Sequence, residues 1–141
     1  MRCMVFVKAT EDSEAGVMPS EKDLAEMGAY NEELVNAGVM LDAAGLHASK
    51  KGVRVTYPEG TPTVTDGPFA ETKELIAGYW IWEVKSLDEA IEWSRRIPFN
   101  HGESIEIRPF MEPEDFGEAL TPELQERGEA LEARMEEQKD S

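Results

Sequence analysis

The chain has 141 residues, a length typical of one domain with its own hydrophobic core. Its formal net charge of −16, with no basic run, disfavours binding to nucleic acid or to an anionic membrane. No stretch approaches the roughly 18–20 apolar residues of a transmembrane helix, and the apolar start over residues 1–8 is too short for a signal peptide. We therefore expect a cytoplasmic protein in which the lone Cys3 is reduced and acts as a small buried hydrophobe.

Hydrophobic patterning predicts alternating strands and helices. Two helices start at capping boxes, Ser20 with Asp23 and Ser86 with Glu89, and Pro98 is expected to end the second helix. Apolar and β-branched residues alternate in strand-like segments at residues 2–9, 39–46, 53–57, 77–84 and 104–110, and a weaker segment at 61–65 is a candidate extension of the sheet. The turn signal Lys50-Lys51-Gly52 predicts that residues 39–46 and 53–57 pair as a hairpin.

This order predicts an α+β fold, the ferredoxin-like split βαβ arrangement with an antiparallel sheet and both helices on one side. Segments 2–9 and 77–84 are apolar on both faces, so the sheet face without helices would be a large apolar patch in a monomer. A second copy packing sheet to sheet is the simplest cover, since twofold dimers are the commonest oligomers. The C-terminal tail is the alternative cover.

The C-terminal tail is set apart by its charge. Residues 111–141 hold eleven acidic and three basic residues, a net charge of −8, which is half of the total. Thr121-Pro122 begins a predicted helix whose apolar positions form a narrow stripe, although Gly128 disfavours it. We therefore expect a domain over residues 1–110 and an acidic, partly helical extension over residues 111–141.

One nine-residue run stands out, Asp66-Gly67-Pro68-Phe69-Ala70-Glu71-Thr72-Lys73-Glu74. Its first three residues favour a turn, and Phe69 offers an anchor to the core. The polar residues that follow indicate either a surface connection, with an ion pair worth about 0–1 kcal/mol, or a loop that closes a cavity.

This run, with Ala77-Gly78-Tyr79 and the segments 86–90 and 105–109, resembles the DGPFAETKE family of YCII-related proteins over about residues 1–110. The resemblance implies a dimeric α-β barrel, with two sheets facing one another and a cleft on each protomer. Some enzymes of the wider superfamily use a His-Asp pair whose histidine lies early in the first helix, and the helix that starts at Ser20 has no histidine there. The resemblance also implies an accessory or regulatory role linked to an extracytoplasmic-function sigma factor.

The residues suited to chemistry lie near the ends of the predicted strands. Asp66 and His47 are the two potential general bases, because a histidine titrates near neutral pH. Arg108 suits an anionic ligand. The expected ligand contacts are Glu71, Lys73, Tyr79 and Arg108.

The sequence leaves two functions open. One is a dimeric small-molecule-binding or accessory domain, and the alternative is a cofactor-independent lyase or isomerase with Asp66 or His47 as base. No HExxH, GxGxxG or P-loop pattern occurs, so we expect neither a metal nor a cofactor.

Overall fold

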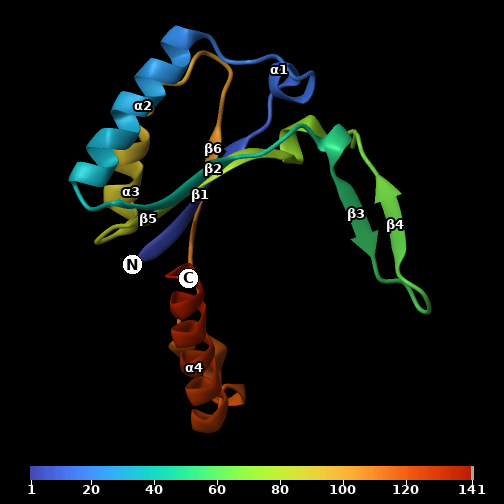
Figure 1. Cartoon of the computed structure of the whole chain (residues 1–141), viewed down its shortest axis with the longest axis vertical. Coiled ribbons are helices and arrows are strands. Elements are labelled where there is room, and N and C mark those ends of the chain that lie inside the picture. Colours follow the sequence, from blue (N-terminus) through green and yellow to red (C-terminus); the bar gives the residue numbers. More distant parts are fainter. Residues whose placement is uncertain (141) are drawn as a thin grey trace. The chain divides into compact units, whose positions relative to one another are not determined.

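The computed structural model of the chain describes residues 1–140. They divide into two compact units, Met1–Pro109 and the residues from Phe110 onward. The first unit is built on a four-stranded antiparallel sheet with the strand order β2-β5-β1-β6 (Figure 1). The bounds of these strands are Arg2–Lys8 for β1, Met40–Gly45 for β2, Ile76–Glu83 for β5 and Ile105–Pro109 for β6. This order is that of a split βαβ fold, which confirms the α+β, ferredoxin-like prediction.

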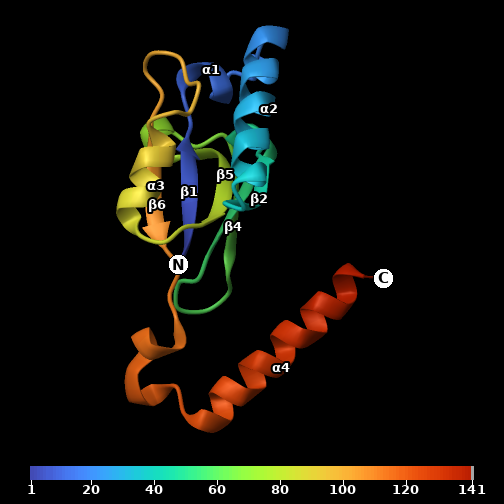
Figure 2. The ribbon, with the colours of Figure 1, turned by 90° about the vertical axis from the view of Figure 1, so that its left-hand side faces the viewer.

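Two helices, α2 (Glu21–Asn36) and α3 (Leu87–Ser94), cover one face of the sheet. Figure 2 shows α2 on the β2 side of the sheet and α3 on the β6 side. The buried core between these layers comes from strands β1 and β5, from both helices, and from one residue just before β2 and one just after β5: Cys3, Val5, Tyr30, Leu34, Val39, Trp80, Trp82, Val84 and Ala90. Burial raises the pKa of the Cys3 thiol, as befits a residue that packs like a small hydrophobe.

Both predicted helix starts are confirmed by their capping bonds. At α2, Ser20 Oγ accepts from the Asp23 amide at 3.1 Å and Asp23 Oδ2 accepts from the Ser20 amide at 3.3 Å. At α3, Ser86 Oγ accepts from the Glu89 amide at 3.2 Å, but Glu89 Oε1 accepts from the Lys85 amide, one residue earlier than in a capping box. This helix ends at Ser94, before Pro98, so the proline does not itself set the end.

The predicted hairpin between residues 39–46 and 53–57 is wrong. Strand β2 pairs with β5, while β3 (Val53–Thr56) pairs with β4 (Thr63–Asp66) in a separate two-stranded sheet. The turn of the β3–β4 hairpin lies at Pro58-Glu59-Gly60, where Gly60 has a φ of +103°. Residues 49–51 instead form a short 3-10 turn, η1. Figure 1 shows the β3–β4 hairpin projecting away from the main sheet.

Three short elements complete the first unit. Helix α1 (Glu11–Glu14) was not predicted from the sequence, and it is held by a capping box between Thr10 and Ser13. The turns η1 (Ser49–Lys51) and η2 (Thr72–Glu74) flank the hairpin in sequence. Strand β3 therefore comes directly after η1, and strand β4 leads into the nine-residue run, which ends in η2.

The second unit contains the short helix η3 (Pro113–Ala119) and the long helix α4 (Pro122–Lys139). Thr121 Oγ1 accepts from the Leu124 amide at 3.2 Å and so caps α4, which confirms the predicted helix despite Gly128. The predicted stripe is solvent-exposed, at 47% for Leu124, 54% for Leu131 and 53% for Met135. Within the described residues, no helix has the length and apolar character needed to cross a membrane.

Candidate ligand-binding pocket

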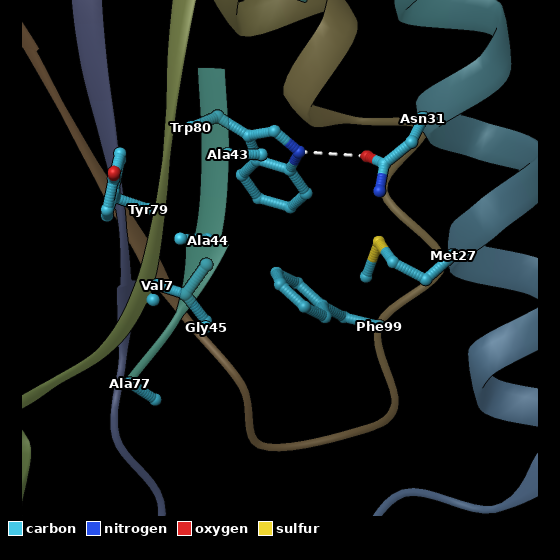
Figure 3. Close-up of a pocket in the computed structure, with 11 residues that line it drawn as sticks. Val7, Met27, Asn31, Ala43, Ala44, Gly45, Ala77, Tyr79, Trp80 and Phe99 are labelled. Carbon is cyan, nitrogen blue, oxygen red and sulfur yellow. Dashed lines mark hydrogen bonds between the residues drawn. The ribbon is translucent and has the colours of Figure 1, made fainter. Parts of the chain in front are cut away.

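A cavity of about 320 Å³ lies between helix α2 and the β2–β5 edge of the sheet (Figure 3). Helix α2 supplies Met27 and Asn31, and Phe99 comes from the connection between α3 and β6. The full lining is Val7, Met27, Asn31, Ala43, Ala44, Gly45, Ala77, Gly78, Tyr79, Trp80 and Phe99. The volume is in the range of pockets that hold small organic ligands, roughly 300–1,000 Å³.

Small residues on two paired strands create this space. Ala43, Ala44 and Gly45 of β2 lie opposite Trp80, Tyr79 and Gly78 of β5. A Cβ atom at Gly78 would stand 2.9 Å from the Ala44 carbonyl oxygen, so the close approach of the two strands requires glycine here. Beside the Trp80 indole, the wall of the cavity formed by these strands therefore carries little side-chain bulk.

Among the described residues that line the pocket, Asn31 carries the only side-chain amide. Its Oδ1 accepts a 2.9 Å hydrogen bond from Trp80 Nε1. Because an indole N–H can only donate, this bond fixes which end of the amide faces the tryptophan. Figure 3 shows the Asn31 Nδ2 atom turned toward Met27. Within residues 1–140, no protein group accepts a hydrogen bond from this nitrogen.

The cavity carries no charge. Among the residues that the structure describes, its lining includes no carboxylate, amine, guanidinium or imidazole group. Tyr79 belongs to the lining, but its side chain does not point into the cavity, because it lies on the other side of β5 from Trp80 (Figure 3). There the Tyr79 hydroxyl donates to Asp42 Oδ2 at 3.2 Å, and this hydrogen bond raises the pKa of the phenol.

The six predicted site residues are distributed over several elements. Tyr79 alone lines the cavity, while His47 follows β2, Asp66 ends β4 and Arg108 lies on β6 at the other edge of the sheet. Glu71 and Lys73 are exposed beside and within η2. Within the described part of the chain, no hydrogen bond or ion pair joins any two of the six; Arg108 Nε instead lies 3.9 Å from Glu106 Oε2. Their roles as bases or ligand contacts stay predictions.

The nine-residue run fastens the hairpin to the rest of the unit. The Gly67–Pro68 peptide bond is cis, and the Gly67 amide donates to the Gly52 carbonyl at 3.0 Å. The Phe69 amide donates to Ser49 Oγ at 3.1 Å, and the Arg54 guanidinium lies 3.9 Å above the Phe69 ring. These contacts give the run a structural role that is independent of any ligand.

Ser49 also bonds helix α1, through the side chain of Glu14. The Ser49 amide donates to Glu14 Oε2 at 2.8 Å, and the Ser49 hydroxyl donates to Glu14 Oε1. Both hydrogen bonds lower the pKa of Glu14, the hydroxyl bond most. Glu14, Ser49 and Phe69, which we call the clasp, thus join three segments that are far apart in the sequence.

A second cavity, of about 530 Å³, is polar and lies among α1, the start of α2 and residues 100–103. Two of its four carboxylates already serve the backbone: Asp23 in the α2 cap and Glu103, which accepts from the Asn100 amide at 2.7 Å. In the described residues no three His, Cys, Asp or Glu side chains are grouped so that they could hold a metal ion. This cavity therefore has fewer features of a binding site than the first.

Tyr79 is the one lining residue of the first cavity that was among the predicted site residues; the missed ones include Met27, Asn31 and Phe99, which come from outside the sheet. They come from two separate segments, so no local motif marks them. Two signals were present: Asn31 interrupts the inward stripe of α2 four residues after Met27, and small residues cluster in both Ala43-Ala44-Gly45 and Ala77-Gly78.

Comparisons with known proteins identify the family of the chain. The model of the YCII-related domain family matches residues 1–114. An uncharacterised protein of Rhizobium meliloti (strain 1021), R00369, is 32% identical over 91 residues, which are 63% of this chain and 73% of that protein. A solved structure, 5-chloro-2-hydroxyhydroquinone dehydrochlorinase (TftG) from Burkholderia phenoliruptrix AC1100 in complex with 2,5-dihydroxybenzoquinone, aligns with a TM-score of 0.42 and 14% identity over 79% of this chain and 94% of that one.

Proposed function

We propose that this chain, which belongs to the YCII-related domain family, binds a small, mainly apolar molecule in the cavity between α2 and the sheet. The observation that carries the proposal is the lining: apolar walls, one amide with an unused donor, and no ionisable side chain directed inward. Such a lining suits the recognition of a ligand, whereas general acid–base chemistry needs a titratable group within reach of the substrate.

A binding domain without catalytic groups fits an accessory or regulatory role better than an enzymatic one. The link to an extracytoplasmic-function sigma factor rests on the family resemblance and adds a protein partner to this proposal. In the alternative function, a lyase or isomerase with Asp66 or His47 as base, the reaction takes place outside this cavity, because neither residue lines it. Glu71, Lys73 and Arg108 belong with that alternative as ligand contacts.

We further propose that the domain is a homodimer that pairs through the sheet face opposite the helices. This open face carries the apolar residues Met4, Phe6, Tyr79 and Ile81 in two neighbouring strands. Its charged residues are Arg2, Lys8 and Arg108 against Asp42, Glu83 and Glu106, so its formal charge is zero. The whole chain carries a formal charge of −16, so a second copy meets little repulsion on a face that is neutral and apolar.

The binding proposal is tested with a cavity-filling variant. Ala43 packs against the core beside Trp80, so Ala43→Leu is expected to occupy the cavity. Binding of small neutral aromatic probes, followed by tryptophan fluorescence and calorimetry, should be lost in Ala43→Leu. It should persist in Ala29→Leu, the same change at an exposed position of α2. Equal affinity in both variants, or no binding of any probe to the unmodified protein, would contradict the proposal.

A further inference from the structure

We infer that the cavity selects uncharged aromatic molecules that carry a hydrogen-bond acceptor, such as a ketone oxygen, and that Asn31 is the residue that recognises this acceptor. The inference rests on the proposed function and adds to it the chemical class of the ligand. Three features of the cavity support it: the orientation of one amide, the absence of charge, and the shape of the walls.

The orientation of the Asn31 amide is set by a residue that cannot move easily. Trp80 is 4% exposed and its ring lies against Tyr30, Trp82 and Phe99, with centroids 6.1, 5.8 and 6.3 Å away. Rotating the Asn31 amide by half a turn would bring its NH₂ group against the Trp80 N–H, two donors facing each other. The Asn31 Nδ2 atom is therefore held as the donor available to the cavity.

An unpaired donor makes the polarity of the ligand matter. A molecule that enters the cavity displaces water from Asn31 Nδ2, and the free energy lost is recovered only where the ligand offers an acceptor at that point. Sites that hold such a polar group discriminate strongly against analogues that lack the matching atom. A purely apolar molecule of the same shape is thus disfavoured.

The absence of charge excludes ionic ligands of the same shape. A carboxylate would leave water for a lining that offers one neutral donor and no cation, which is costly. The net charge of −16 adds a long-range repulsion of anions. The acceptor that matches Asn31 is therefore a neutral oxygen.

The walls of the cavity favour a flat ring. On one side lie Ala43, Gly45 and Gly78, whose small size leaves the strand surface bare. Across from them Figure 3 shows the Phe99 ring and the Met27 side chain, with the thioether sulfur directed toward the space. Aromatic rings and thioethers both form favourable contacts with an aromatic ligand. A planar molecule fits between these two walls with its polar edge toward Asn31.

Three probes of nearly equal shape separate these features: acetophenone, isopropylbenzene and benzoate. In the unmodified protein, acetophenone is expected to bind about tenfold or more tightly than isopropylbenzene, and benzoate more weakly than either. The dissociation constants are measured by calorimetry and by quenching of tryptophan fluorescence.

Two substitutions at Asn31 identify the residue responsible. Asn31→Asp keeps an acceptor for the Trp80 N–H but replaces the donor by an oxygen, so acetophenone should lose about tenfold or more in affinity. Asn36→Asp makes the same change at an exposed position in the last turn of α2 and should leave all three affinities unchanged. Asn31→Leu should bind isopropylbenzene at least as well as the unmodified protein, which also shows that the variant is folded.

The outcomes distinguish the inference from the proposed function. If acetophenone and isopropylbenzene bind equally, if benzoate binds best, or if Asn31→Asp keeps the acetophenone preference, the ligand class is wrong while the cavity remains a binding site. If no probe binds, or if Ala43→Leu binds all three unchanged, both the ligand class and the proposed function are overturned.

Discussion

The carbonyl oxygen of Ser49 occupies the place that a side chain on Gly67 would need, since a Cβ atom there would lie 1.8 Å from it. The backbone φ of Gly67 is not positive, so the glycine is required by this close approach and not by its conformation. The contact brings the nine-residue run against η1, where Ser49 also bonds Phe69 and Glu14. Gly67 is thus the residue that lets the clasp close.

We predict that Gly67→Ala lowers the free energy of unfolding by about 2 kcal/mol, because backbone must shift to make room for the methyl group. The control is Gly28→Ala in α2, where a Cβ meets nothing within 4 Å. That substitution should stabilise by about 0.5–1 kcal/mol through the higher helix propensity of alanine. Urea unfolding monitored by circular dichroism measures both changes, and an unchanged midpoint for Gly67→Ala would refute the close contact.

The clasp should make stability depend on pH in the acid range. The pKa of Glu14 is lowered in the folded protein, so its contribution is present above the usual pKa of about 4.3 and is lost as the pH falls through the folded value. Ser49→Ala should cost roughly 1 kcal/mol at pH 7, the usual net contribution of a partly exposed hydrogen bond, and less at pH 3. Thermal unfolding of both proteins from pH 7 to pH 3 tests this, and a difference that stays constant with pH would argue against Glu14 as the acceptor.

The secondary structure that was predicted correctly is the part that local chemistry decides. Ser20, Ser86 and Thr121 each cap a helix through the amide three residues later, so the neighbouring sequence suffices to place these starts. The pairing of strands is decided elsewhere. The turn signal at residues 50–52 predicted the wrong hairpin because β2 finds its partner in β5, more than thirty residues later, while the bend with the left-handed glycine lies at Gly60.

The cavity was not predictable from the sequence for the same reason. Its polar group, Asn31, is significant only because Trp80, on a different element, donates to its oxygen and leaves its nitrogen unused. Tyr79 was predicted as a ligand contact from its type, but its side chain lies on the open face and bonds Asp42. Strand alternation puts Trp80 and Tyr79 on opposite faces of the sheet, as they are in the structure, but alternation does not reveal which face holds the cavity.

A hydrogen bond between the two helices should be measurable through Tyr30. Its hydroxyl donates to the Trp93 carbonyl at 2.7 Å, and Tyr30 is 4% exposed. Tyr30→Phe should cost about 1–2 kcal/mol, since a partly buried carbonyl loses its partner. Tyr57→Phe is the control, because Tyr57 is 79% exposed at the end of the hairpin and should change stability by less than about 0.5 kcal/mol. Equal unfolding free energies for the two variants would contradict this role of Tyr30.

The same residue predicts a loss of stability at alkaline pH. Burial raises the pKa of Tyr30 far above the usual value of about 10, so its contribution is complete below pH 10 and declines as the pH rises toward the folded value. The unmodified protein should therefore lose stability above pH 10 faster than Tyr30→Phe does. Denaturant unfolding at pH 8 and at pH 11 compares the two proteins. Equal losses of stability would show that the pKa of the Tyr30 phenol is the same in the folded and unfolded states.

A charge in the middle of the open sheet face should abolish the proposed dimer. Ile81 lies opposite Met4 on one side and Asp42 on the other, so Ile81→Glu places a carboxylate among apolar residues and beside an existing acid. The unmodified protein is expected at twice 15.8 kDa and the variant at 15.8 kDa in light scattering. Leu24→Glu, at a position of α2 that is 61% exposed, is the matched control and should stay dimeric. A 15.8 kDa species for the unmodified protein would reject the dimer itself.

Removal of the second unit tests whether a second copy of the chain or the C-terminal tail covers this sheet face. Among the described residues, the core cluster and the side chains packed against it all lie in the first unit, so a chain ending at Pro109 keeps the whole core and should fold. If a second copy covers the sheet, the shortened chain remains a dimer, because its open face still has a formal charge of zero. If the acidic tail is the cover, the shortened chain exposes Met4, Phe6 and Ile81 and should bind a hydrophobic dye and aggregate, which the full chain does not. Light scattering and dye binding on the full and the shortened chain distinguish these results, because removing the tail makes the apolar face accessible only if the tail is what covers it.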